Sequence, residues 1–587
     1  MNGVQDLRSS RESADDADGR LSFLRGQIVG ADSLLATPFG DRLMVYCDYT
    51  ASGRSLLFVE NYLQSLQRIY ANTHTEDDTT GRNMTHLLHE AEALIKAEVN
   101  AGPDGCVIAV GTGATGAINK LQQILGVYLP PATRVRLAEA ADACMGLERR
   151  QAFDAYLRDH QPVVFVGPYE HHSNEISWRF GLASVVEVGL DEDGGIDLDH
   201  LETLLRAPEY QGRVRIGSFS AASNVTGTRT PVHRIARLLH RHGAIACFDF
   251  AASAPYVAID MNPPDDGEGD ASLDAVFISA HKFLGGPGSS GILVFSRRLY
   301  PSDLPPTVAA GGTVDYVSEW GQDFSADIEA RERAGTPGTL QVLKAALAFE
   351  VKRWVTPALI ERREAELLSR AMTRWQHATN VEILGNPDPD RRIAIVSFNV
   401  SMGAGQYLHP KFVTALLNDL FGIQSRAGCS CAGPYGHRLL HIDADRSARY
   451  RHAVQEGHCG MKPGWCRIGF HYTMDDAEAG YIIEAVEFVA RYGYRFIPLY
   501  RFDLETGTWT HRQAPSVFPR LTIAAALETP RVAPSARTAE ERAGLYRRYL
   551  EEAGREAEAL AARPGGRDVK LEGDLGELQF FGLTEED

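Results

Sequence analysis

The sequence FISAHKFLGGPGSSGILVF, residues 277–295, is the stretch most informative about the fold. An apolar run at 274–279 is typical of a buried strand, and His281 and Lys282 follow directly after it. A glycine-rich turn then leads into a second apolar run at 292–295. Lysine is rarely buried unless the protein uses its amine. The position of Lys282 at the end of a buried strand therefore predicts a chemical role.

A carboxylate elsewhere in the chain complements this lysine. Asp249 ends another apolar run, within the sequence CFDFAAS. A desolvated lysine loses its proton and becomes a nucleophile that can bond an aldehyde. A buried aspartate can keep a pyridine nitrogen protonated. Lys282 and Asp249 together therefore predict a binding site for pyridoxal 5'-phosphate (PLP).

Length and composition limit the class of protein. The chain has 587 residues, 44% of them hydrophobic, and a formal net charge of −18, which predicts more than one domain and a large core. The acidic balance argues against nucleic acid as a partner, and the absence of a long apolar run predicts no membrane span. The N-terminal segment lacks an apolar signal core, and the eight cysteines are sparse. We therefore expect a cytoplasmic protein without a disulfide framework.

Short apolar runs that alternate with helical or loop segments predict an α/β fold. The runs lie at 106–110, 163–167, 184–188, 214–219, 244–249, 275–279 and 291–295. This pattern is typical of a mostly parallel sheet, here of seven strands, covered by helices. Helical periodicity also predicts a helix that starts at Thr85.

The later sequence predicts a second, smaller domain of α+β type. Helical patterns there surround a strand-like segment at 393–400, with an amphipathic helix near 475–491. We expect four segments: an N-terminal segment that is partly disordered, a large PLP-binding domain, a small domain that carries a cysteine-containing loop, and a C-terminal extension with an Ala/Glu/Arg-rich helix. Their boundaries are 1–40, 41–340, 341–520 and 521–587.

The segment VIAVGTGATGAINKL, residues 107–121, has the pattern of a strand, a glycine-rich turn and a helix. Backbone N–H groups at the start of a helix favour an anion, and Thr115 can add a hydroxyl donor. Ser279 and His281 offer further ligands for a phosphate group. The alternative interpretation is an ordinary tight turn between a strand and a helix.

Two polar segments follow other predicted strands. His171 and His172 lie in GPYEHHSNEISW, and Asn224 lies in SFSAASNVTGTRTPV. A histidine here can stack on a flat cofactor, and Asn224 can bond the cofactor's phenolic oxygen. The alternatives are a structural or solvent-facing histidine and a turn asparagine.

The loop GIQSRAGCSCAGPYGHRLL, residues 422–440, combines an arginine with two thiols. The Arg426 guanidinium suits a substrate carboxylate, and Cys429 and Cys431 lie among small residues, as a reactive thiol on a mobile loop would. Two alternatives remain: a pair of inert, buried thiols, or a metal site whose spacing does not match common zinc motifs. That metal site would draw on Cys429, Cys431, Cys459, Cys466, His437, His441 and His458.

These motifs together resemble the class V aminotransferase group of fold type I PLP enzymes, and most closely the cysteine desulfurase/selenocysteine lyase family. The resemblance covers roughly residues 43 to 490. The matching stretches, in order, are VYCDYTASGRSL, NTHTEDDTTGR, VGTGATGAIN, YEHHSN, AASNVTGT, FDFAAS, ISAHKFLGGPGS, RERAGTPGTL, SRAGCSCA and WCRIGF.

The resemblance implies roles for the residues that contact the cofactor. Lys282 would bond the aldehyde and move the substrate's α-proton, and Asp249 would hold the ring nitrogen protonated. His171, rather than His172, would stack on the ring, and Asn224 would contact the ring oxygen. The residues implied to bind the phosphate are Thr115, Ser279, His281 and, from the neighbouring subunit of a homodimer, Thr336.

The resemblance also implies the substrate-binding residues. Arg426 would hold the amino-acid carboxylate with support from Arg467, and His74 would line the substrate entrance. Cys431 would accept the sulfur as a persulfide. The sequence departs from the family at Ala252, where a glutamine is common, and at Cys429, where a histidine is frequent.

The implied reaction removes sulfur from L-cysteine, or selenium from selenocysteine, and releases L-alanine. A sulfur-acceptor protein is a possible partner, and no metal is predicted. One alternative is a class V aminotransferase, epimerase or C–S lyase that acts on another amino acid. The other is a non-catalytic scaffold with a PLP-enzyme fold.

Overall fold

The structure is a computed structural model that describes residues 17–73, 75–513, 522–523, 536–562 and 567–585. Predicted features at other positions, including disorder near the N-terminus and the role of His74, lie outside the described residues. The chain forms two compact units. The large unit comprises Ser52–Asn224 and Thr228–Ala358, and the small unit comprises Met1–Ala51, Val225–Gly227 and Leu359–Asp587. Among the described residues, no helix is both long and apolar enough to cross a membrane.

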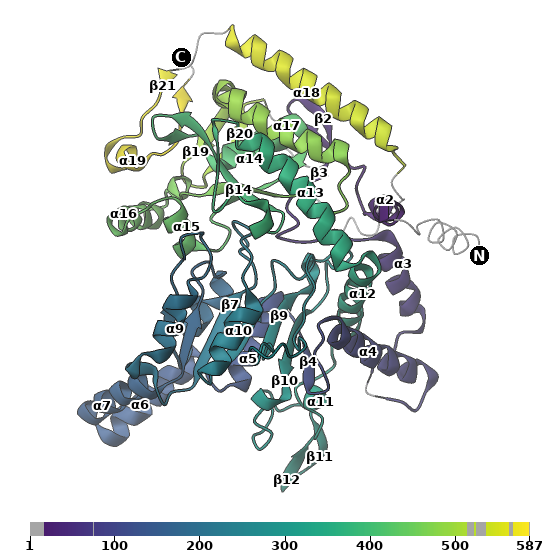
Figure 1. Ribbon diagram of the computed structural model, residues 1–587, viewed down its shortest axis with the longest axis vertical. Coiled ribbons are helices and arrows are strands. Elements are labelled where there is room, and N and C mark those ends of the chain that lie inside the picture. Colours follow the sequence, from purple (N-terminus) through teal and green to yellow (C-terminus); the bar gives the residue numbers. More distant parts are fainter. Residues whose placement is uncertain (1–16, 74, 514–521, 524–535, 563–566, 586–587) are drawn as a thin grey trace. The chain divides into compact units, whose positions relative to one another are not determined.

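A seven-stranded sheet forms the centre of the large unit (Figure 1). Its order is β4-β10-β9-β8-β7-β5-β6, and only β10 runs antiparallel to its neighbours. The seven predicted runs are these strands, so the predicted mostly parallel α/β sheet is confirmed. The strands are β4 (Gly105–Val110), β5 (Val163–Val166), β6 (Ser184–Glu187), β7 (Arg215–Ser220), β8 (Ile245–Asp249), β9 (Ala275–Ser279) and β10 (Gly291–Ser296).

The antiparallel strand β10 explains the position of Lys282. Antiparallel neighbours can be joined by a short turn, whereas parallel strands need a long crossover. Strand β9 therefore returns through a brief connection at 280–290, and its first turn is the 3-10 helix η4 (Ala280–Lys282). Lys282 is thus held close to the end of a buried strand.

Helices cover the sheet and supply much of its core. Side chains of α5, including Ile118 and Leu121, pack with Phe277 and Leu293 of the sheet. Helix α4 begins at Thr79, earlier than predicted, because the Asp78 carboxylate accepts a hydrogen bond from the Gly81 N–H at 2.8 Å and caps the helix. The main helices are α3 (Leu57–Leu66), α4 (Thr79–Glu98), α5 (Gly113–Ile124), α6 (Pro131–Met145), α7 (Leu147–His160), α9 (Leu198–Arg206), α10 (Val232–Arg241) and α12 (Thr339–Val355).

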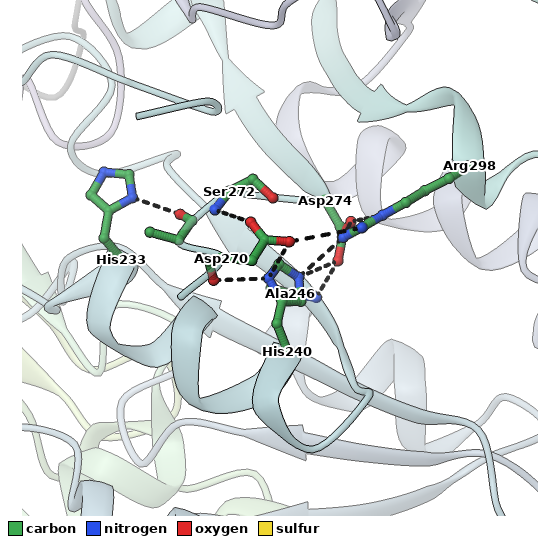
Figure 2. Close-up of polar contacts among 8 residues, drawn as sticks. His233, His240, Ala246, Asp270, Ser272, Asp274 and Arg298 are labelled. Carbon is green, nitrogen blue, oxygen red and sulfur yellow. Dashed lines mark hydrogen bonds and ion pairs between the residues drawn. The ribbon is translucent and has the colours of Figure 1, made fainter. Parts of the chain in front are cut away.

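A polar cluster around Asp274 links His240 of α10 to the sheet (Figure 2). Asp274 directly precedes β9, so the cluster lies at the end of that strand remote from Lys282. Asp274 is buried, and its Oδ2 accepts a hydrogen bond from the Ala246 N–H at 2.9 Å and lies 3.0 Å from His240 Nε2. Its Oδ1 accepts a hydrogen bond from Arg298 Nε at 2.6 Å. The Asp274 carboxylate thus links α10, strands β8 and β9, and the segment after β10.

The small unit contains an antiparallel sheet of order β13-β14-β18-β17, with β15 paired to β14. This confirms the predicted α+β character. Its strands are β13 (Val381–Ile383), β14 (Ile395–Gly403), β15 (Gln406–Tyr407), β17 (Arg426–Gly428) and β18 (Trp465–Gly469). Its main helices are α13 (Pro357–Trp375), α14 (Pro410–Phe421), α15 (Gly433–Leu439), α16 (Ala444–Gln455), α17 (Asp476–Tyr492) and α18 (Ala539–Ala561).

Candidate active site

Three neighbouring strands of the large unit end at one edge of the sheet. Asp249 is the last residue of β8 and pairs in parallel register with Ser220, the last residue of β7, and with Phe277 of β9. Parallel strands bring their carboxyl ends to the same edge, where α/β proteins bind ligands. Asp249, Ser279 and Lys282 therefore belong to one polar edge of the sheet.

Asp249 is a buried carboxylate at the carboxyl end of β8. It is 4% exposed, and its Oδ1 accepts a hydrogen bond from the Ala251 N–H at 2.8 Å. Burial raises the pKa of Asp249, against the lowering effects of this hydrogen bond and of the Lys282 charge. A buried carboxylate is stabilised by a cationic partner, and a protonated ring nitrogen is such a partner.

Lys282 and His281 lie side by side on η4, and both are half-buried. Burial and the charge of Lys282 lower the pKa of His281. The lowered pKa favours the neutral imidazole, in which one ring nitrogen donates a hydrogen bond and the other accepts one.

The start of α5 faces the end of β9. The Ala114 N–H donates a hydrogen bond to Ser279 Oγ at 2.9 Å, and the Thr115 hydroxyl lies 2.7 Å from Ser173 Oγ. A Cβ atom on Gly113 (φ +57°) would lie 2.9 Å from both Ser279 Oγ and His281 Cε1. Only glycine fits this close approach. Three of the four residues predicted to bind phosphate, Thr115, Ser279 and His281, thus lie around the first turn of α5.

His171 and Asn224 both follow strands of the same sheet. His171 is half-buried, and its Nδ1 accepts a hydrogen bond from the Ser173 N–H at 3.1 Å, which orients the ring. Asn224 comes after β7 and is 8% exposed. Both are placed at the ends of strands, as their sequence contexts predict.

Sequence reasoning missed Glu170, next to His171. Its buried carboxylate accepts hydrogen bonds from the Ser220 N–H at 2.8 Å, from Ser220 Oγ at 2.6 Å and from Asn174 Nδ2 at 2.7 Å. Burial raises its pKa to about 7; these hydrogen bonds oppose the rise, and the Asp249 charge adds to it. The available signal was a charged residue shortly after the apolar run VVFV of β5, separated from it by Gly167, Pro168 and Tyr169.

Thr336 lies on the wall of a cavity of about 760 Å³ in the large unit. It is exposed, and Asn72 Nδ2 lies 3.5 Å from its hydroxyl oxygen. Lys120, Ser289 and Arg333 also line the cavity. A role for Thr336 in a neighbouring subunit stays a prediction.

Arg426 and Arg467 lie directly opposite each other on β17 and β18 of the small unit. Arg467 is buried, and its Nη2 lies 2.8 Å from Asp48 Oδ1. Arg426 is more exposed, and its Nη1 lies 3.8 Å from Asp48 Oδ2. The Asp48 carboxylate therefore holds Arg467 by a hydrogen bond and lies within ion-pair distance of Arg426. Asp48 is a second residue that sequence reasoning missed, although it lies within the motif VYCDYTASGRSL.

The two thiols of the loop differ in exposure. Cys429 is exposed and Cys431 is half-buried. The alternative of two buried, inert thiols is therefore wrong for Cys429. Within the described part of the chain, no group of three His, Cys, Asp or Glu side chains is arranged to hold a metal ion.

Comparisons with known proteins agree with this arrangement. The sequence pattern "Aminotransferase class-V" matches residues 152–481. A probable cysteine desulfurase of Halalkalibacterium halodurans is 26% identical over 411 residues, which cover 69% of this chain and 87% of that protein. Another, of Streptomyces coelicolor, is 26% identical over 396 residues, which cover 67% and 84%.

Solved structures share the fold. A cysteine desulfurase from Thermococcus onnurineus superposes with a TM-score of 0.60 at 20% identity, covering 80% of this chain and 98% of the other. The Escherichia coli cysteine desulfurase CsdA gives 0.55 at 21% identity, covering 75% and 93%. The chain belongs to the class V aminotransferase family and has the fold type I architecture. Enzymes of this family generally depend on PLP.

Proposed function

We propose that the protein is a PLP-dependent cysteine desulfurase that converts L-cysteine to L-alanine through a persulfide on Cys431. The observation that carries the proposal is the Cys431 thiol in the loop directly after β17, the strand that holds Arg426 beside Asp48. The names of the relatives support the same reaction.

The residues of the large unit fit PLP. Asp249 offers a buried carboxylate to a protonated ring nitrogen, Lys282 offers an amine to an aldehyde, and the first turn of α5 offers a cradle in which a side chain on Gly113 would not fit. Bound PLP supplies an electron sink for negative charge that develops at the substrate's α-carbon. Ala252, where relatives of this type often have glutamine, leaves the ring oxygen to Asn224.

Side chains of this protein carry out the other steps of the proposed reaction. Lys282 takes the proton from the α-carbon of the substrate, and His171 shields one face of the ring. Arg426 and Arg467 orient the substrate carboxylate through charge-assisted hydrogen bonds. The Cys431 thiolate attacks the substrate sulfur, which leaves the carbon skeleton for release as alanine.

We also infer the setting of the reaction. A homodimer would let Thr336 reach the phosphate of the neighbouring subunit, and His74 would line the substrate entrance. A cytoplasmic location fits thiols that must stay reduced at Cys429 and Cys431. Selenocysteine is a chemically equivalent substrate, and a protein that accepts the sulfur is a possible partner.

Two substitutions test the proposal. Lys282→Ala should abolish the visible absorbance that PLP acquires when it bonds a lysine, and Cys431→Ser should retain that absorbance but lose alanine formation from L-cysteine. Cys144→Ser, which removes an exposed thiol on α6, is the matched control and should behave as wild type. Undiminished alanine formation by Cys431→Ser would contradict the proposal. Formation of a keto acid or a racemised amino acid would instead favour another class V reaction.

A further inference from the structure

The two cysteines of the small unit's loop lie at the first and third positions of a tight turn. The Ala432 N–H donates a hydrogen bond to the Cys429 carbonyl oxygen at 3.1 Å, which closes a four-residue β-turn. The two central residues, Ser430 and Cys431, have φ angles of 51° and 57°. This hydrogen bond with positive φ at both central positions is typical of a type I′ turn, in which glycine, asparagine and aspartate predominate.

Serine and cysteine are unfavourable residues for such a turn. A non-glycine residue in the left-handed region is strained, because its Cβ atom crowds the backbone. The flanking chain holds the turn in place. Before it, Gly428 pairs with Trp465 in the sheet, and after it the buried side chain of Tyr435 anchors α15. The strained turn therefore lies between a paired strand and a helix with a buried anchor.

The turn brings the Cα atoms of the two cysteines closer together than an extended chain would. In an extended chain, alternate Cα atoms lie about 7 Å apart, which is the limit beyond which two cysteines cannot be bridged. A turned residue between Cys429 and Cys431 shortens this separation. Cys429 is exposed and Cys431 is half-buried, so a reagent can reach the first thiol while the second is more enclosed.

We propose that Cys429 is a resolving thiol that releases hydrosulfide from the Cys431 persulfide. This inference rests on the proposed function, which supplies the persulfide. The Cys429 thiolate attacks Cys431 Sγ, a bond forms between the two Sγ atoms, and the bond from Cys431 Sγ to the outer sulfur breaks. The outer sulfur leaves with the bonding electrons as hydrosulfide. The outer sulfur is thereby reduced from the persulfide level to hydrosulfide, Cys429 Sγ is oxidised from the thiolate to the disulfide level, and Cys431 Sγ keeps its oxidation state.

A dithiol reductant then returns the loop to its starting state. It attacks the Cys429–Cys431 disulfide by thiol–disulfide exchange and leaves as its own disulfide. A disulfide that bridges alternate residues closes a small, strained ring, and strained, exposed disulfides are the easily reduced ones. The enzyme would therefore deliver sulfur as free hydrosulfide when no acceptor takes it directly from Cys431.

A single turnover without reductant tests the inference. Reduced, PLP-loaded enzyme is mixed anaerobically with one equivalent of L-cysteine. Alanine, hydrosulfide and the mass of the loop peptide are then measured. Wild type should release hydrosulfide in step with alanine, and its peptide should lose two hydrogen atoms through a Cys429–Cys431 bond. Cys429→Ser should instead keep one added sulfur atom on Cys431 and release at least tenfold less hydrosulfide.

Two controls separate the possible outcomes. Cys459→Ser, which removes a half-buried thiol outside the turn, should match wild type, and enzyme without L-cysteine should form no disulfide. Alanine formation with the sulfur retained on Cys431 of wild type would overturn the resolving role and leave the proposed function intact. Sulfur added first to Cys429 would also overturn it. An absence of alanine in wild type would instead refute the proposed function.

Discussion

Arg467 is held by Asp48, with 2.8 Å between the guanidinium Nη2 and the carboxylate Oδ1. Arg467 is buried, whereas its cross-strand neighbour Arg426 is largely exposed and lies farther from the same carboxylate. A buried guanidinium needs a fixed anion, while an exposed one can turn toward a ligand. Arg467 therefore suits a supporting role and Arg426 suits direct contact with a substrate carboxylate.

Replacement of Asp48 tests this division of roles. Asp48→Asn removes the charge that holds Arg467 and pairs with Arg426, so the KM for L-cysteine should rise about tenfold, which corresponds to about 1.4 kcal/mol of binding energy. The visible absorbance of bound PLP should not change. Asp41→Asn, which changes an exposed carboxylate in the same unit, is the control. An unchanged KM would show that Asp48 does not position the substrate-binding groups.

Replacement of Asp249 tests the partner of the ring nitrogen. Asp249→Asn keeps the shape of the side chain and its hydrogen bond from Ala251 but removes the buried charge. We expect kcat to fall about a hundredfold or more, as is typical when a preorganised electrostatic group is lost. The measurement is alanine formation by PLP-loaded enzyme, with Asp199→Asn on the exposed surface of α9 as the control. A wild-type kcat would remove Asp249 from the proposed site.

Glu170 should make stability depend on pH. Burial raises its pKa from 4.5 to about 7 in the folded protein, so between these values the folded state binds more protons than the unfolded state. Stability therefore falls as pH rises from about 4.5 to about 7, by at most roughly 3 kcal/mol. Glu170→Gln, which stays neutral, should lack this component. Thermal unfolding of both proteins across this range provides the measurement, and identical pH profiles would contradict the prediction.

The Asp274 cluster should contribute a second pH-dependent component. Burial lowers the pKa of His240, but the hydrogen bond and charge of Asp274 and the contacts with Asp270 outweigh it, and the net pKa is raised. Charged Arg298 lies against the same carboxylate. The stabilisation from His240 is therefore full below its ordinary pKa of 6.5 and is lost as pH rises through the raised value.

Substitution at His240 tests that component. The thermal midpoint of wild type should exceed that of His240→Gln by more at about pH 6 than at about pH 8. Asp274→Asn should lower the midpoint at both pH values, because it leaves the Arg298 and Ala246 donors with a weaker acceptor. If the difference in thermal midpoint between wild type and His240→Gln is the same at both pH values, charged His240 does not cause the pH-dependent stabilisation.

Much of the fold follows from local patterns. Each of the seven apolar runs became a strand of one sheet, because continuous runs of valine, isoleucine and phenylalanine suit strands buried on both faces. The start of α4 was misplaced because the cap formed by Asp78 lies in a polar stretch that resembles a loop.

The amino-acid sequence by itself determined which residue types end each strand, and hence Lys282, Asp249 and the glycine-rich turns, since these signals are local. Only the tertiary structure decided which distant groups share an environment. Burial raises the pKa of Glu170, and that burial comes from strands and loops far apart in the chain. The ion pairs of Asp48 with Arg426 and Arg467 also join residues that are distant in sequence. Desolvation and charge pairing depend on spatial neighbours, and no local pattern along the chain specifies those neighbours.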